Sequence, residues 1–241
     1  MSPIKTSSQR YSAKTHMGLV RPVNEDAILA LPSLGLWAIA DGMGGHQGGD
    51  FASQTVIDAL SSLPEDLPPA SLPGRIRDAL HQAHRDIQAE AARRGSAIIG
   101  TTVVLLVVSG DHFLCLWAGD SRLYRLRGGM LEMISEDHSV VGELVAAGQL
   151  TWDQAEHHAQ NNQITHAIGV GSVPGIEKRR GAIVPGDRFL LCSDGLTKYA
   201  NEAMLKRIMQ DAPLDTLADE LMRVALAGGG ADNISVIAVE V

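Results

Sequence analysis

The chain has 241 residues, the size of one domain or at most two. Hydrophobic residues make up 45% and charged residues 20%, so most of the chain should fold. The formal net charge of −8 argues against a basic nucleic-acid surface and against electrostatic binding to anionic lipid, so we expect neither nucleic acid nor a membrane as partner. No apolar run approaches the roughly 20 residues that span a bilayer, and the N-terminal residues lack the apolar stretch of a signal peptide.

The first half of the chain predicts two strands and then two helices. Short apolar runs at 26–31 and 36–40 are typical of strands. Apolar residues recur at helical spacing over 49–60 and 71–94. The intervening stretch, 61–74, contains four prolines, which cannot lie inside a helix or a central strand. It therefore predicts a short connector between helices that pack side by side.

The second half predicts antiparallel hairpins and further helices. Helical patterns cover 140–160, where Thr151 and Gln154 have the form of a capping box, and 197–227. Several neighbouring strand-like runs are separated by only two or three residues, which requires antiparallel pairing. Clusters of strands with segregated helices predict an α+β fold. The strands expected here are 101–108, 112–118, 121–127, 130–134, 175–184, 187–192 and 233–241.

Both cysteines, Cys115 and Cys192, lie within apolar runs. Such positions are typical of buried, reduced thiols, which indicates a cytoplasmic protein. A single disulfide between the two is the less favoured interpretation.

Several apolar, strand-like runs end in an aspartate that lies next to a glycine. Runs end at Asp41, Asp120 and Asp194 in this way, and Asp232 immediately precedes another run. Taken singly, an Asp-Gly pair is more often a turn than a ligand. Taken together, aspartates at the ends of apolar strands should be partly buried, and buried carboxylates need cations.

The basic residues near these aspartates are few. Arg122 is a candidate partner for Asp120, and Lys198 for Asp194, but no basic residue lies in the segment 36–45 around Asp41. Several carboxylates with too few lysines and arginines are typical of a site for a hard divalent ion, which favours Mg²⁺ or Mn²⁺.

Six short motifs follow one another along the chain: RPVNED at 21–26, DGMGG at 41–45, GTT at 100–102, GDSR at 119–122, SDG at 193–195 and DN at 232–233. Their order and spacing resemble the PPM/PP2C family of metal-dependent protein serine/threonine phosphatases, and most closely its bacterial members that consist of the catalytic domain alone. The resemblance extends from about Tyr11 to Val241. It implies a tail over 1–10 and a single domain over 11–241, in which 140–164 forms a flap beside the active site.

The resemblance implies a β-sandwich of two antiparallel sheets flanked by helices, with two Mg²⁺ or Mn²⁺ ions at one end. Asp41 is expected to bridge the two ions, and the carbonyl of Gly42 to bind one of them. Asp194 and Asp232 are the expected ligands of the other ion. Asp120 matches a carboxylate that helps to bind a third, weaker ion in bacterial members.

Three further residues have roles by the same resemblance. Glu25 and Asp26 match residues that hold metal-bound waters, and Arg21 matches the phosphate-binding arginine. Two metal ions can share one water and lower its pKa, so that hydroxide attacks phosphorus. The fixed fork of donors in Arg21 can orient two phosphate oxygens. The chain lacks the Cys-x₅-Arg loop of cysteine phosphatases and the GK[ST] of a P-loop, so neither of those routes applies.

The chain departs from the family pattern at two positions. Met43 stands where many eukaryotic members carry a histidine that acts as proton donor, and His166 replaces an arginine. His46, five residues after Asp41, is a candidate substitute for the donor, although a metal-bound water is favoured over it. His138, like His157 and His158 in the predicted flap, is expected to be a packing or surface residue.

The sequence therefore predicts an enzyme that hydrolyses phosphoserine and phosphothreonine on proteins and opposes a partner Ser/Thr kinase. A competing hypothesis is a catalytically weak sensor or scaffold, against which the intact set Arg21, Asp41, Asp194 and Asp232 argues. The same residues are also compatible with an esterase for small phosphate metabolites and with a phosphatase acting on a phosphorylated anti-sigma antagonist.

Overall fold

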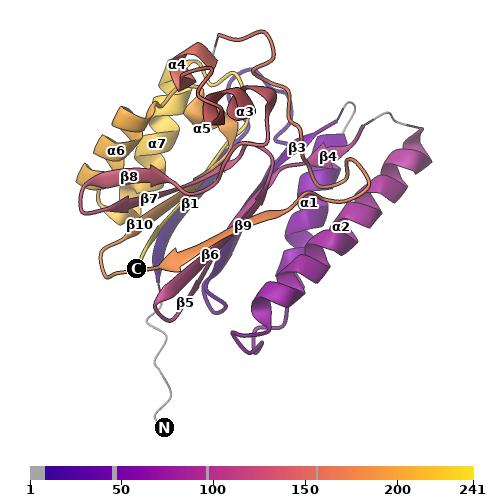
Figure 1. The fold of residues 1–241 in the computed structure, drawn as a ribbon, viewed down its shortest axis with the longest axis horizontal. Helices are drawn as coiled ribbons and strands as arrows, with labels where there is room; N and C mark the ends of the chain where they lie inside the picture. The colour runs from indigo at the N-terminus through magenta and orange to yellow at the C-terminus, as the bar shows by residue number, and fades with distance from the viewer. Residues whose placement is uncertain (1–8, 45–47, 96–97, 156) are drawn as a thin grey trace.

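The computed structural model describes residues 9–44, 48–95, 98–155 and 157–241. Two antiparallel sheets pack face to face, and helices cover the outer side of each (Figure 1). This arrangement confirms the predicted α+β sandwich flanked by helices. In the described part of the chain, no helix is both long enough and apolar enough to cross a bilayer.

The first sheet has five strands in the order β1–β11–β10–β7–β8 and joins the two ends of the chain, because Arg10 lies opposite Glu240. The predicted tail 1–10 falls mostly outside the described residues, and Arg10 already belongs to β1. The strands of this sheet are β1 (Arg10–His16), β7 (Arg122–Arg127), β8 (Met130–Met133), β10 (Arg188–Cys192) and β11 (Ile234–Glu240).

The second sheet has the order β2–β3–β5–β6–β9, and a short strand, β4, pairs with the end of β3. Successive side chains of β3 alternate between its two faces, as the pleat of a strand requires. The strands are β2 (Asp26–Leu31), β3 (Leu36–Met43), β4 (Gly100–Thr101), β5 (Val103–Ser109), β6 (His112–Ala118) and β9 (Glu177–Ala182).

The helices lie in two outer layers, with a small helical segment at one end of the sandwich (Figure 1). Helices α1 (Gly48–Ser61) and α2 (Leu72–Arg94) cover the second sheet. The other layer, over the first sheet, consists of α5 (Asp194–Thr197), α6 (Glu202–Asp211) and α7 (Leu214–Gly228). The end segment consists of α3 (Val140–Ala146) and α4 (Trp152–Ala155).

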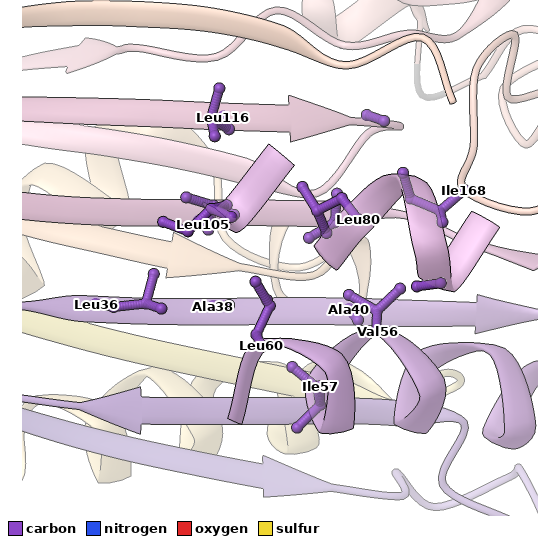
Figure 2. Packing of buried hydrophobic residues seen from close by; sticks show 14 of the residues in the cluster. Leu36, Ala38, Ala40, Val56, Ile57, Leu60, Leu80, Leu105, Leu116 and Ile168 are labelled. Atoms are coloured by element: carbon purple, nitrogen blue, oxygen red, sulfur yellow. The ribbon is translucent and has the colours of Figure 1, made fainter. Parts of the chain in front are cut away.

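Three apolar layers hold these elements together. Trp37 and Ile39 of β3 pack between the sheets, whereas Leu36, Ala38 and Ala40 of the same strand face the helices. Figure 2 shows the second group with side chains of β5, β6, α1 and α2. The third layer lies between the first sheet and α5–α7. Both cysteines are buried and unbonded in these layers, as the sequence predicts.

The predicted helices over 140–160 and 197–227 are each interrupted. Helix α3 stops at Ala146 because Gly148 adopts a left-handed conformation (φ +69°) that ends a helix. In the later segment, the side chain of Asn201 caps α6 by accepting a hydrogen bond from the N–H of Met204, and Pro213 begins α7.

Candidate active site

Five aspartates meet at one end of the sandwich, and they come from both sheets. Asp26 begins β2 and lies directly opposite Asp41 near the end of β3. The other three follow β6, follow β10 and precede β11, respectively. The negative charges of all four neighbours bear on Asp41, so the aspartates that the sequence singles out do converge. They are Asp26, Asp41, Asp120, Asp194 and Asp232.

The backbone of Asp41 is fixed by two threonines. The side chain of Thr102 accepts a hydrogen bond from the N–H of Asp41 (3.1 Å), and the hydroxyl of Thr101 donates to its carbonyl (2.9 Å). The Thr102 hydroxyl also bonds to that of Ser121 (2.7 Å). The GTT and GDSR motifs thus hold Asp41 in place, a role for which the sequence pattern alone carries no signal.

Gly42 lies where no side chain fits. A Cβ atom built there would lie 2.0 Å from the carbonyl oxygen of Gly49 and 2.7 Å from that of Glu25. At Gly49, in turn, a Cβ would lie 2.6 Å from Oε1 of Glu25, whose carboxylate accepts a hydrogen bond from the Gly49 N–H. The two glycines therefore let the start of α1, Glu25 and the end of β3 approach one another closely.

Asp26 is the most buried of these acids, with 7% of its surface exposed. Its Oδ2 accepts a hydrogen bond from the hydroxyl of Ser193 (2.8 Å), but its Oδ1 is buried and has no partner among the described residues. Burial, opposed by its hydrogen bonds, raises the pKa of Asp26 to about 7. An unpartnered buried carboxylate oxygen is the mark of a position that a water or ion completes.

The remaining acids divide into two electrostatic classes. Burial and then the neighbouring carboxylates raise the pKa of Asp41 well above its usual range. Burial and then Asp194 raise the pKa of Asp120 to about 8. Burial alone would raise the pKa of Asp232 too, but Lys198 and Arg21 outweigh it and hold that pKa below its usual range.

Lys198 joins two of the acids. Its Nζ lies 2.8 Å from Asp194 Oδ2 and 2.8 Å from Asp232 Oδ2. The predicted neighbourhood of Lys198 and Asp194 is thus confirmed, and Asp232 is an additional partner. Arg21 also contacts Asp232, with its Nε 2.8 Å from Oδ1 and its Nη2 3.1 Å from Oδ2.

Asn233, the second residue of the DN motif, ties the loop that carries Arg21 and Glu25 to β11. Its Oδ1 accepts a hydrogen bond from the N–H of Glu25 (2.8 Å). Its Nδ2 donates to the carbonyls of Met17 and Val23, both at 2.9 Å. The sequence indicates Asn233 only as part of the DN motif, because its hydrogen-bond partners lie more than 200 positions away along the chain.

The predicted ion pair between Arg122 and Asp120 is wrong. Arg122 instead forms a two-pronged ion pair with Asp137, with Nε 2.9 Å from Oδ1 and Nη2 2.7 Å from Oδ2. Its guanidinium also stacks 4.1 Å from the ring centre of Trp152. The planar guanidinium can satisfy both contacts at once, so Arg122 acts on Asp120 only from a distance, where its charge and that of Lys198 partly offset the raised pKa of Asp120.

A cavity of about 460 Å³ opens beside the acids. Asp120, Asp194 and Lys198 line it on one side, and Trp152 of α4 lines it on the other. The segment 140–164 therefore borders the acidic centre. Whether it moves as a flap stays a prediction.

The histidines occupy supporting positions. Buried His138 accepts a hydrogen bond from the N–H of Gly119 (3.3 Å), and its Nε2 lies 3.5 Å from Glu177. The ring of His166 packs edge-on against His138, with 4.8 Å between the ring centres. His46 lies outside the described residues.

The donor set suits divalent cations. Asp41 is buried among other carboxylates, and Asp26 has a buried oxygen with no partner among the described residues, which are the features of carboxylates prepared for hard ions. As they stand, no three acidic, histidine or cysteine side chains within the described ranges are placed to hold one ion. Asp194 and Asp232 are instead neutralised by Lys198, whose ammonium would be displaced from them by a metal.

Comparison with known proteins gives the class to which this fold and site belong. A model of the protein phosphatase 2C family matches residues 21–228, and the chain belongs to that family. By sequence, it is 36% identical over 96% of its length to the serine/threonine protein phosphatase PstP of Mycobacterium tuberculosis, of which it spans 45%.

Solved structures show the same similarity. PppA, a regulatory component of the T6SS in Pseudomonas aeruginosa, is 41% identical with a TM-score of 0.90, covering 97% of this chain and 98% of that one. The catalytic domain of PstP, determined with two manganese ions, is 35% identical with a TM-score of 0.86, covering 96% of this chain and 97% of that one.

Proposed function

We propose that this protein is a metal-dependent phosphatase that removes phosphate from phosphoserine and phosphothreonine of proteins. The observation that carries the proposal is the convergence of five aspartates at one end of a sandwich of the protein phosphatase 2C family. All members of the predicted set are present there, including Arg21, Asp41, Asp194 and Asp232. Their joint presence favours an enzyme over a scaffold that keeps only the fold.

The acids have distinct proposed roles toward Mg²⁺ or Mn²⁺. Asp41 and the carbonyl of Gly42 would hold one ion, and Asp41 would share a second with Asp194 and Asp232. The support for Asp41 is its burial among the neighbouring carboxylates. When bound there, the ions supply a hydroxide nucleophile at neutral pH and neutralise charge on the phosphate. Asp120, which forms no ion pair within the described part of the chain, is the proposed ligand of a third ion.

The surrounding side chains orient water and substrate. The free Oδ1 of Asp26 and the carboxylate of Glu25 are the proposed acceptors for waters at the metal site. Arg21, with 51% of its side chain exposed, can exchange its contact with Asp232 for two phosphate oxygens. Met43 cannot donate a proton, so a water at the site is the proposed donor to the serine or threonine oxygen.

Partner and compartment follow from the same proposal. A phosphatase of phosphoserine and phosphothreonine opposes a Ser/Thr kinase, and we propose such a kinase as its functional partner. Two buried, unbonded cysteines support a reducing compartment, namely the cytoplasm.

The decisive experiment measures phosphate release from a phosphothreonine peptide with Mn²⁺ or Mg²⁺ present. We expect turnover that EDTA abolishes, and a loss of at least about a hundredfold in kcat for Asp41→Asn, because the substitution removes a charge that the metal site needs. Asp66→Asn, the same change at an exposed residue of the α1–α2 connector, is the matched control and should retain full activity.

Three results would contradict the proposal. Turnover that survives EDTA would remove the metal from the mechanism. Wild-type activity in Asp41→Asn would show that Asp41 is structural. Faster hydrolysis of glycerol phosphate than of the phosphopeptide would favour an esterase for small metabolites.

A further inference from the structure

A second depression lies on the outer face of the second sheet. This groove, of about 530 Å³, opens between the start of α2 and the strands β5, β6 and β9. Strand β6 runs from His112 at the groove to Ala118, two residues before Asp120. Leu116, the lining residue nearest to the acids along β6, precedes Asp120 by four residues. Because a strand rises about 3.3 Å per residue, the near end of the groove lies roughly 13 Å from Asp120 along the chain. We call it the basic groove, lined among others by Arg77, His112, Leu114, Leu116, Lys178 and Arg180.

The floor of the basic groove is apolar and one of its walls is cationic. Lys178 and Arg180 of β9 lie directly opposite Leu116 and Leu114 of β6. Cross-strand partners share a face of the sheet, so these two cations stand beside the leucine floor. Arg77 of α2 lines the groove from the helical side.

The cations of the basic groove lack counter-ions. Arg179, between the two cations of β9, faces the other side of the sheet and pairs with Glu136 at 2.7 Å. For Arg77, Lys178 and Arg180, by contrast, no carboxylate of the described residues lies within ion-pair distance. His112 is the exception on the rim, because its Nδ1 contacts Asp111 at 2.6 Å.

Acidic residues are also missing from the walls, since none of the described residues that line the groove is acidic. The chain has a net charge of −8, whereas this groove carries three cations that have no carboxylate partner among the described residues. The groove is therefore positively charged on a negatively charged protein. All three cationic residues are exposed to solvent. Their arrangement is complementary to a ligand that is both apolar and anionic.

We propose that the basic groove binds an acidic segment of another protein, in which a bulky apolar side chain lies between acidic residues. The apolar side chain would rest on Leu114 and Leu116, and the acidic residues would pair with Lys178 and Arg180 on one wall and with Arg77 on the other. A small inorganic anion would leave the apolar floor uncovered, and a wholly apolar segment would leave the cations unpaired. A partner held there leaves the acidic centre open, so docking is separate from catalysis.

The test is fluorescence anisotropy with a fluorescein-labelled peptide that carries two leucines between runs of glutamate. We expect Lys178→Glu/Arg180→Glu to weaken binding of this peptide by at least about tenfold. The matched control is Lys206→Glu/Arg207→Glu, which makes the same charge change at two exposed residues of α6 in the other helical layer. It should keep nearly wild-type binding. A melting temperature close to that of the wild type verifies that both variants fold. Neither this control nor the binding measurement depends on phosphatase activity.

The peptide itself supplies the second set of controls. Replacing its leucines with serine should weaken binding, and replacing its glutamates with lysine should abolish it. Equal losses in both double variants, unchanged binding of the serine peptide, or no binding by the wild type at about millimolar protein would each overturn the proposal. Sedimentation with phosphatidylserine vesicles that is lost only in Lys178→Glu/Arg180→Glu, without peptide binding, would assign the groove to a membrane surface instead.

Discussion

Lys198 contacts two of the acids at the site. Its ammonium neutralises Asp194 and Asp232 together. The burial of Lys198 would lower its pKa, but the two carboxylates outweigh this and raise it, so the side chain stays charged at neutral pH. A metal ion bound by these two carboxylates would therefore compete with the Lys198 ammonium for them.

Removing this ammonium should have opposite effects on the two states of the site. We expect Lys198→Met to lower the melting temperature in EDTA, because two carboxylates lose their shared counter-ion. The same variant should bind Mn²⁺ more tightly, because no ammonium has to be displaced. Thermal unfolding and isothermal titration calorimetry measure the two effects, with Lys206→Met as the exposed control. A lower Mn²⁺ affinity in Lys198→Met would show that the lysine supports the metal rather than competing with it.

His84 of α2 gives a pH dependence away from the site. It is 3% exposed, and its Nδ1 accepts a hydrogen bond from the N–H of Gly169 (2.9 Å), which requires a neutral ring. Burial and then His81 lower its pKa below the usual value. As pH falls through about 6.5, His84 becomes protonated in the unfolded chain but stays neutral in the folded chain. Protonation therefore favours the unfolded state, and the free energy of unfolding decreases as pH falls through that region.

The corresponding experiment compares free energies of unfolding near pH 7.5 and pH 5.5. We expect the loss of stability at the lower pH to be smaller in His84→Gln than in wild type, with His158→Gln, at a partly exposed histidine outside α2, as control. Buried carboxylates contribute to both proteins equally, so the difference isolates His84. An unchanged difference between the two pH values would contradict the assignment.

At the scale of elements, a stacking contact helps to hold the segment that carries α3 and α4. Trp152 lies over the guanidinium of Arg122, which Asp137 holds in place. A desolvated cation–aromatic contact of this kind is worth about 0.5–2 kcal/mol. Trp152 therefore adds a modest stabilising contact to those made by Val141 and Ala155, which are buried, and by the bridge between Ser139 and Ile164.

Trp152→Ala should loosen the segment without touching the acidic centre. We expect KM for a phosphopeptide to rise several-fold, whereas kcat/KM for p-nitrophenyl phosphate stays within about twofold, since only the larger substrate reaches the segment. Trp152→Phe, which keeps a ring over Arg122, should recover most of the loss. Parallel losses on both substrates would instead place Trp152 in the chemistry.

The elements and the site differ in how far the sequence predicts them. The strands and helices with apolar periodicity agree with the prediction to within a few residues. Strand β1 was not predicted, because its sequence has few apolar residues and it lies at a sheet edge, where one side faces solvent. The aspartates were predictable because each follows or precedes a strand. The partners of Arg122 and Asn233 were not, because only the packed sheets bring them together.

At the scale of the whole molecule, the acids belong to both sheets, so a metal at the site clamps the sandwich. Ligands that bind only the folded state stabilise it by RT ln(1 + [L]/Kd), about 2.7 kcal/mol at a hundredfold excess over Kd. We therefore expect Mn²⁺ to raise the melting temperature and EDTA to reverse the change. Asp41→Asn should show a much smaller rise. A rise of equal size in that variant would place the stabilising ion elsewhere.

The pairing of β1 with β11 has a consequence for how the chain is made. Strand β11 lies between β1 and β10, so β1 cannot join the first sheet until β11 has been synthesised. Bringing two strands so distant in the sequence together lowers the chain entropy before the contacts between them can stabilise the sheet, and this slows folding. While a ribosome is still synthesising the chain, β1 has no partner and Asp232 has yet to emerge. The acidic centre is thus assembled last, so an unfinished chain is expected to be inactive.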